Sequence, residues 1–243
     1  MCKPMQSRAN ESCMPRRNFL KVAAGIGVAA IASAPKLGAS APPALPAQST
    51  STNLSPADVL RLLADGNQRF VAGSAVGPHR SLARVKELSA KQAPIAAFLG
   101  CADSRVPIEI VFYQGFGDLF VARVAGNVID SAIIGTLEFG TAVLGAKVLY
   151  VLGHTGCGAV SAAIKGDEVP GQISTLFQHL RPAVRKANGD VDAAVRENVR
   201  IQAGLIAESS PVIARLIRDG KLDVAAGVYD LASGKVKTLD WRS

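Results

Sequence analysis

The 243-residue sequence has few aromatic and few charged residues, and it has no apolar run long enough to cross a membrane. Aromatic residues make up 5% and charged residues 19%, while 49% are hydrophobic, which is typical of a chain that folds around a core. No run of lysine and arginine is interleaved with aromatic residues, so a base-stacking surface for nucleic acid is not expected. The apolar run at residues 22–34 is shorter than the roughly 20 residues that a spanning helix needs, so we expect no stable membrane span.

Cysteine is scarce in the body of the chain. The four cysteines are Cys2, Cys13, Cys101 and Cys157, and the first two lie in an N-terminal segment that we expect to be removed. A small secreted domain held together by disulfides carries more cysteines at closer spacing. The two remaining thiols therefore need another explanation.

The N-terminal segment has the features of an export signal. Arg16 and Arg17 precede the apolar run at residues 22–34, which ends in small residues, and this resembles a twin-arginine signal. Residues 1–34 carry five basic residues against one acidic residue, so they hold half of the net charge of +8. We expect a signal peptide at residues 1–34, an Ala/Pro/Ser-rich linker at residues 35–53 and one folded domain at residues 54–243. The protein would then be periplasmic or extracellular.

The body of the chain alternates predicted strands with predicted helices. Ser55 and Pro56 begin an amphipathic helix. Short apolar runs predict buried strands at residues 94–100, 119–124 and 148–152, with a later strand and hairpin at 223–240. Helical spacing appears at residues 107–113, 131–144, from Cys157 onward, 173–186 and 191–219. The order predicts an α/β fold with a mainly parallel β-sheet flanked by helices.

Two motifs follow predicted strands directly. Residues 101–105 read Cys-Ala-Asp-Ser-Arg, and residues 153–158 read Gly-His-Thr-Gly-Cys-Gly. Because ligands of parallel sheets bind beyond the carboxyl ends of the strands, the side chains of Cys101, His154 and Cys157 can converge there. Two thiolates and one imidazole are a ligand set for Zn²⁺, and three protein ligands leave one tetrahedral position for water, as in catalytic zinc sites.

Asp103 and Arg105 are placed to assist such a metal. Residues two apart in an extended segment point the same way, so both can face the site with Cys101. The arginine fork can hold the carboxylate and keep it ionised, and its free lone pairs can accept the proton of a zinc-bound hydroxide.

The combination of Cys-x-Asp-Ser-Arg with His-x-x-Cys some fifty residues later resembles the β-class carbonic anhydrases. The similarity extends through residues 106–107, 117–120, 123 and 125–127, and covers the chain from Leu54 onward. It implies a lyase of the plant-like type that hydrates carbon dioxide reversibly to bicarbonate through zinc-bound hydroxide. The implied metal ligands are Cys101, His154 and Cys157, with Asp103 as a fourth ligand in some resting forms, and the implied catalytic pair is Asp103 and Arg105.

The resemblance also suggests groups that contact the substrate. Gln92 stands nine positions before the first cysteine, where plant-like members use a glutamine, and the N–H of Gly158 adds a donor at a helix start. Phe120 and Phe139 correspond to apolar pocket walls, the latter replacing a tyrosine. Members with a regulatory bicarbonate pocket carry tryptophan where this chain has Phe98, so we expect no such regulation.

Alternatives remain at this stage. The same metal site can hydrolyse carbonyl sulfide or carbon disulfide, and a redox-sensing zinc module can use the same thiols without catalysis. The family's dimer makes the predicted helix at residues 54–70 an expected interface, in a homodimer or a homotetramer.

Overall fold

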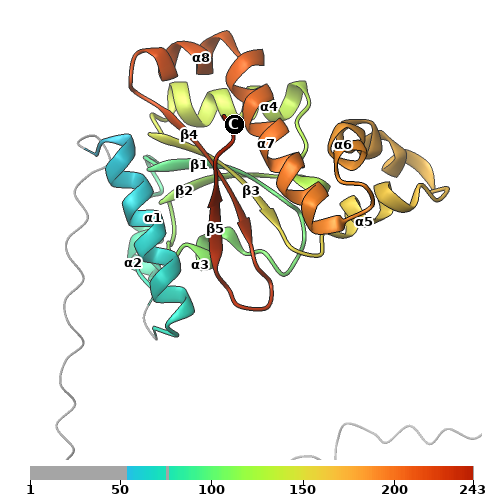
Figure 1. The fold of residues 1–243 in the computed structure, drawn as a ribbon. Coiled ribbons are helices and arrows are strands. Elements are labelled where there is room, and N and C mark those ends of the chain that lie inside the picture. Colours follow the sequence, from blue (N-terminus) through green and yellow to red (C-terminus); the bar gives the residue numbers. More distant parts are fainter. Residues whose placement is uncertain (1–53, 75–76, 243) are drawn as a thin grey trace, which may run out of the picture. The chain divides into compact units, whose positions relative to one another are not determined.

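A computed structural model describes residues 54–74 and 77–242 (Figure 1). The expected signal peptide at residues 1–34 and linker at residues 35–53 lie outside the described residues. Within the described part of the chain, no helix combines the length and the apolar character that a membrane span requires.

A five-stranded sheet forms the centre of the fold, in the order β2-β1-β3-β4-β5. The first four strands in this order are parallel, and β5 returns antiparallel to β4. The predicted α/β class is confirmed. The strands are β1 (Ala96–Gly100), β2 (Leu119–Arg123), β3 (Val148–His154), β4 (Asp223–Tyr229) and β5 (Val236–Leu239).

Helices cover both faces of this sheet (Figure 1). The α-helices are α1 (Pro56–Val71), α2 (Leu82–Glu87), α3 (Ile108–Val111), α4 (Ser131–Glu138), α5 (Gly158–Lys165), α6 (Ser174–Lys186), α7 (Val191–Ser209) and α8 (Pro211–Arg218). Short helical turns are η3 (Ala125–Asn127), η4 (Phe139–Val143) and η5 (Gly171–Ile173).

Strand alternation divides the core into two layers. Ala97 and Leu99 of β1 face one layer, which also contains buried residues of α6, α7 and α8. Phe98 faces the other layer, where it packs with α1 and α3 and stacks on Tyr150 of β3 at 5.2 Å between ring centroids. Every residue of β1 is buried, as expected for a central strand covered on both sides.

The first helix begins as its sequence predicts. The Ser55 side chain accepts a hydrogen bond from the N–H of Asp58, the Asp58 carboxylate accepts one from the N–H of Ser55, and Pro56 opens the helix. Near its other end, the side-chain amide of buried Asn67 donates hydrogen bonds to the carbonyl oxygens of Val111 and Gly234. Its oxygen accepts a hydrogen bond from the N–H of Val236, so Asn67 connects α1 to α3 and β5.

Several predicted boundaries were wrong. The expected single helix at residues 191–219 is two helices, because Ser210 caps α8 and Pro211 has no N–H with which to continue α7. The stretch at residues 131–144 begins as α4 but widens into the π-helical turn η4. Helix α2 was not predicted, because it is short and buries no residue.

Candidate metal centre and active site

The ends of two neighbouring strands bring three potential metal ligands together. Cys101 follows β1 directly, His154 is the last residue of β3, and Cys157 precedes α5. Strands β1 and β3 are parallel neighbours with Gly100 opposite Leu152, so their carboxyl ends lie side by side. Gly156 has a φ of 61°, and this left-handed conformation turns the chain between the histidine and the second cysteine.

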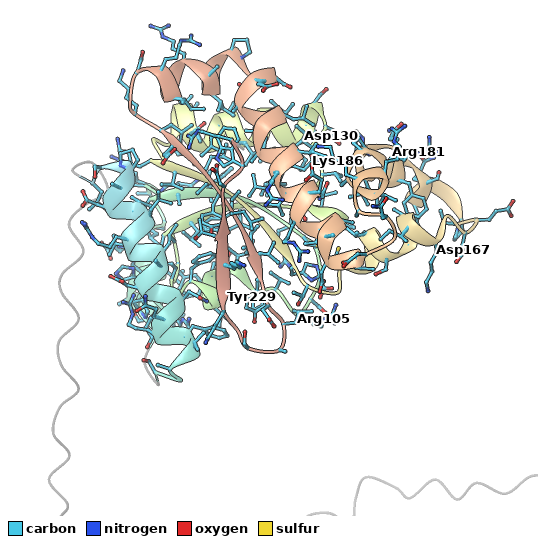
Figure 2. All side chains as sticks on the ribbon, in the orientation of Figure 1. Arg105, Asp130, Asp167, Arg181, Lys186 and Tyr229 are labelled. Carbon is cyan, nitrogen blue, oxygen red and sulfur yellow. The ribbon has the colours of Figure 1, made fainter. Side chains whose placement is uncertain are left out.

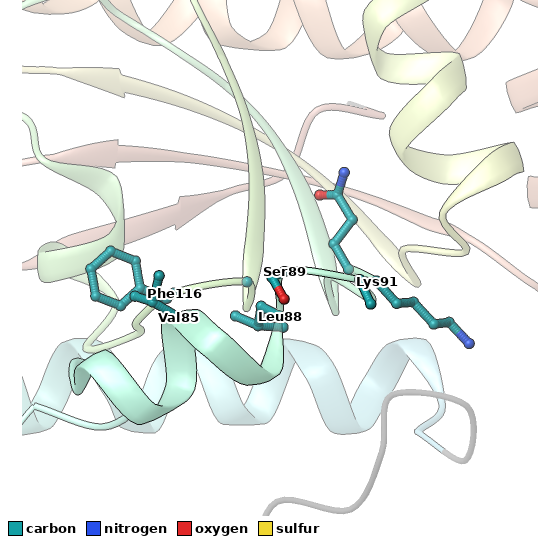
Figure 3. A pocket seen from close by; sticks show the side chains of 8 residues that line it. Val85, Leu88, Ser89, Lys91 and Phe116 are labelled. Atoms are coloured by element: carbon teal, nitrogen blue, oxygen red, sulfur yellow. The ribbon is translucent and has the colours of Figure 1, made fainter.

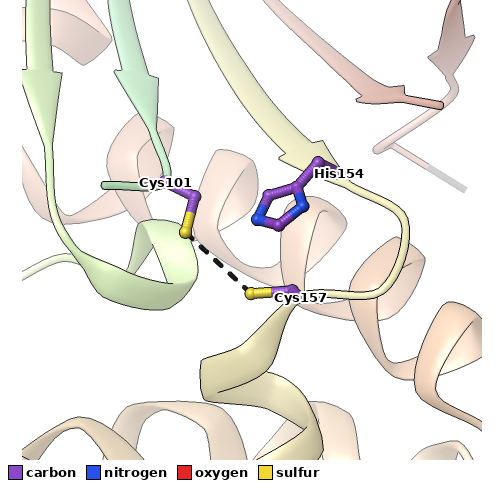
Figure 4. A group of neighbouring side chains, drawn as sticks. All are labelled: Cys101, His154 and Cys157. Carbon is purple, nitrogen blue, oxygen red and sulfur yellow. Dashed lines mark hydrogen bonds between the residues drawn. The ribbon is translucent and has the colours of Figure 1, made fainter. Parts of the chain in front are cut away.

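The three ligand atoms form a compact, buried cluster (Figure 4). They all lie within 4.8 Å of one another, and the two sulfurs are 3.9 Å apart. Both cysteines are free thiols, since a disulfide requires about 2.05 Å between sulfurs. All three side chains are buried, with exposed fractions of 4% for Cys101, 0% for His154 and 1% for Cys157. Bulk water therefore has little access to the ligand atoms.

The histidine ring is oriented for metal binding. Its Nδ1 lies 3.0 Å from the carbonyl oxygen of Thr155, an arrangement in which Nδ1 carries the proton and donates. Nε2 is buried and makes no hydrogen bond within the described residues. A buried imidazole nitrogen with a free lone pair next to two sulfurs fits a divalent metal that prefers nitrogen and sulfur ligands.

The two sulfurs share a hydrogen bond, which lowers the pKa of the Cys101 thiol and raises the pKa of the Cys157 thiol. A thiolate on one sulfur is thereby stabilised by the thiol of the other. The backbone N–H of Gly126 also donates to Cys101 Sγ at 3.3 Å, which favours the same charge. The site is therefore prepared for a cation by negative charge on sulfur.

Asp103 and Arg105 lie at the border of this cluster. Arg105 donates to both carboxylate oxygens, and this hydrogen bonding holds the pKa of the Asp103 carboxyl well below its usual range. Asp103 Oδ2 lies 3.7 Å from His154 Nε2, so an ionised carboxylate faces the metal ligands. Arg123 donates to the carbonyl oxygens of Cys101 and Asp103 and fixes the loop that carries both. Figure 2 shows Arg105 and Tyr229 of β4 at the same end of the fold.

Gly158 is the first residue of α5, directly after Cys157, so its N–H belongs to the helix start beside the cluster.

The structure places the other three residues predicted to contact the substrate, Gln92, Phe120 and Phe139, in other parts of the fold. Gln92 is exposed and helps to line a pocket with Leu88, Lys91 and Phe116 (Figure 3). Phe120 pairs with Ala97, four positions before Cys101, which corresponds to about 13 Å along a strand.

Phe139 packs against Phe120, with 6.1 Å between ring centroids, and it is 47% exposed. Within one chain, the structure therefore does not bring Gln92, Phe120 or Phe139 to the metal ligands.

Sequence reasoning missed the support that α7 gives to this site. Asp192 accepts a hydrogen bond from the N–H of Gly156, and Asn198 donates to the carbonyl oxygen of Gly126. Asn198 and Gln202 are each 1% exposed. Their position four residues apart on the otherwise apolar face of α7 is the sequence signal that could have identified a buried polar pair.

Comparisons with known proteins agree with this geometry. The family model described as "Carbonic anhydrase" matches residues 96–236. "Carbonic anhydrase 2" of Mycobacterium tuberculosis is 37% identical over 196 residues, which cover 77% of this chain and 95% of the relative.

Solved structures give the same result. The β-carbonic anhydrase CafA of Aspergillus fumigatus aligns with a TM-score of 0.60 at 28% identity, over 65% of this chain and 80% of that one. A structure from Sordaria macrospora, described as one of two tetrameric β-carbonic anhydrases, shares the fold with a TM-score of 0.61 at 24% identity, over 74% of this chain and 96% of that one. The fold and site define an α/β enzyme with a metal-capable Cys/His/Cys cluster. The chain belongs to the carbonic anhydrase family, and within it to the β class.

Proposed function

We propose that this chain hydrates carbon dioxide reversibly to bicarbonate and a proton, with Zn²⁺ held by Cys101, His154 and Cys157. The observation that carries the proposal is the cluster itself. It combines two sulfurs with a buried, unpaired imidazole nitrogen, all within 4.8 Å of one another. Three protein ligands of this kind leave a coordination position for water, which distinguishes catalytic from structural zinc sites.

The metal and the protein contribute different parts of the chemistry. A zinc ion bound there supplies the acidity that makes water a nucleophile near neutral pH. Asp103, kept ionised by Arg105, accepts a hydrogen bond from the attacking oxygen and turns that oxygen's free lone pair toward carbon. The Gly158 N–H at the start of α5 donates to an oxygen of the bicarbonate as negative charge develops on it.

We further propose that a second copy of the chain completes the substrate pocket, in a homodimer or homotetramer. Phe120 lies opposite Ala97, four residues before Cys101, and Phe139 packs against Phe120. Gln92 lines a pocket that includes none of the three proposed metal ligands. Phe139 is half-exposed beside β2, which is an edge strand of the sheet. The tetrameric description of the Sordaria macrospora proteins also supports assembly. Light scattering on wild type and on Phe139→Asp tests this, with a smaller particle and lower activity expected for the variant.

Export is a separate proposal, based on the sequence alone. Residues 1–34 would direct twin-arginine export to the periplasm or to the outside of the cell. Residues 35–53 would link this signal peptide to the catalytic domain, which residues 54–243 would form. Changing Arg16 and Arg17 together to lysine should leave the protein inside the cell. Unchanged export of that double variant would contradict the proposal.

The proposed reaction is tested by stopped-flow hydration of carbon dioxide with the purified protein. We expect hydration well above the buffer rate, and slower turnover of carbonyl sulfide and carbon disulfide. Rapid hydrolysis of either sulfur compound without carbon dioxide hydration would assign the same site to another substrate.

A further inference from the structure

Helix α7 contacts three segments around the proposed metal ligands: the end of β3, the turn between His154 and Cys157, and η3. Asp192 of α7 accepts a hydrogen bond at 3.3 Å from the N–H of Gly156, in the turn between His154 and Cys157. About two turns later, α7 packs under Gly153, where an added Cβ would lie only 2.6 Å from Val199 Cγ2. Helix α7 therefore fixes the end of β3 on both sides of the histidine.

The third segment is η3, the turn beside Cys101, and it is held by a chain of four buried hydrogen bonds. The N–H of Gly126 donates to Cys101 Sγ at 3.3 Å, and the carbonyl oxygen of Gly126 accepts from Asn198 Nδ2 at 2.8 Å. Asn198 Oδ1 accepts from Gln202 Nε2 at 3.1 Å, and Gln202 Oε1 accepts from the N–H of Ile129 at 3.0 Å. This series of hydrogen bonds begins at Cys101, a proposed metal ligand, and ends at Ile129, just after the same turn.

This arrangement determines which way each amide group faces. Because Asn198 Oδ1 accepts from Gln202, the donor end of Asn198 must point to the carbonyl oxygen of Gly126. Gly126 has a φ of 76°, a left-handed conformation that favours glycine. The hydrogen bond from Asn198 of α7 therefore helps to hold the Gly126 peptide with its N–H toward sulfur.

We propose that Asn198 is a positioning residue of the metal site, which acts through Gly126 to direct an N–H onto Cys101 Sγ, and that Gln202 locks Asn198 in the required orientation. The inference rests on the proposed role of Cys101 as a metal ligand. A hydrogen bond to a ligating sulfur draws electron density from it and orients its lone pairs, so outer contacts of this kind tune a metal site. Asn198 thus sets how strongly Cys101 donates to the metal.

Cobalt(II) in the full-length protein is the probe, because its sulfur-to-cobalt charge-transfer absorption reports directly on thiolate donation. The variants are Asn198→Ala, which removes the donor to Gly126, and Gln202→Met, which keeps a similar volume but frees Asn198 to rotate. Ile206→Val is the matched control, because Ile206 is fully buried one turn further along α7 and its apolar side chain has no donor or acceptor with which to join the hydrogen bonds. For each protein, the absorption spectrum and the cobalt dissociation constant are measured together.

We expect the charge-transfer band of Asn198→Ala to move to longer wavelength, because the sulfur becomes a stronger donor. Its cobalt dissociation constant should nevertheless rise about tenfold or more, because the sulfur loses the partner that holds it in position for the metal. Gln202→Met should move both quantities in the same direction by a smaller amount, and Ile206→Val should match wild type.

Wild-type spectra and affinities in folded Asn198→Ala would overturn the inference, and so would an equal change in Ile206→Val. If Asn198→Ala does not fold, Gln202→Met decides by the same criterion. A wild-type protein without any sulfur-to-cobalt band would instead refute the proposed metal site, and the inference with it.

Discussion

Arg105 holds Asp103 through two parallel hydrogen bonds, from Nε to Oδ1 at 2.9 Å and from Nη2 to Oδ2 at 2.8 Å. The backbone N–H of Arg105 adds a third hydrogen bond to Oδ1 at 2.9 Å. The carboxylate is therefore fixed in place as well as kept ionised, with Oδ2 toward His154. Asp103 is thus positioned to accept a hydrogen bond, whereas Cys101, His154 and Cys157 are positioned to hold the metal.

Asp103→Asn should retain zinc but lose turnover. The amide keeps the size of the side chain but cannot act as a charged acceptor, so we expect the hydration rate to fall by about a hundredfold or more. Zinc content by mass spectrometry and stopped-flow kinetics on the same sample check this. If the variant lost zinc in proportion to activity, Asp103 would be a structural ligand rather than an acceptor.

Cys157→Ser should remove zinc and activity together. A serine hydroxyl is a much weaker zinc ligand than a thiolate, and the two remaining ligands cannot hold the ion alone. Cys13→Ser is the control, because Cys13 lies in the N-terminal segment, and it should keep both properties. Full zinc content in Cys157→Ser would exclude this cysteine as a ligand.

Asn67→Ala should destabilise the fold without altering the chemistry. Asn67 is buried, and its loss leaves the carbonyl oxygens of Val111 and Gly234 and the N–H of Val236 without this partner. We expect a loss of about 2 to 4 kcal/mol in the free energy of unfolding, measured by urea denaturation. Exposed Gln68→Ala on the same helix should change it by less than about 0.5 kcal/mol. Equal losses of stability in the two variants would contradict the role of the Asn67 hydrogen bonds in joining α1 to α3 and β5.

Bicarbonate should inhibit the enzyme without cooperativity. The family resemblance implies that allosteric members carry tryptophan where this chain has Phe98. Phe98 is fully buried in a cluster with Phe112 and Tyr150, at 5.0 and 5.2 Å between ring centroids. A phenyl ring has no N–H with which to bind an anion. Initial rates over a range of bicarbonate concentrations should therefore fit simple inhibition, and a sigmoidal curve would show a regulatory site.

Much of the fold follows from local pattern. The apolar strands β1 and β3 and the capped helix α1 were predictable because each is encoded within a few consecutive residues. The convergence of Cys101 with His154 and Cys157 was predictable because neighbouring parallel strands must end at the same edge.

Features that depend on contacts between distant segments were not predictable in the same way. The hydrogen bond from Asn198 to Gly126 joins residues 72 positions apart, and nothing near either residue indicates the other. The separation of Phe120 from Cys101 appeared only once strand register was known, because the sequence does not say which residues of β1 and β2 lie opposite each other.

The most direct test of the central claim is a zinc titration of the metal-free protein, followed by stopped-flow hydration of carbon dioxide. The account predicts that hydration is absent without metal, rises in proportion to added zinc, and reaches its plateau at one zinc ion per chain. Full activity without zinc, or a folded protein that binds one zinc ion per chain and does not hydrate carbon dioxide, would contradict it.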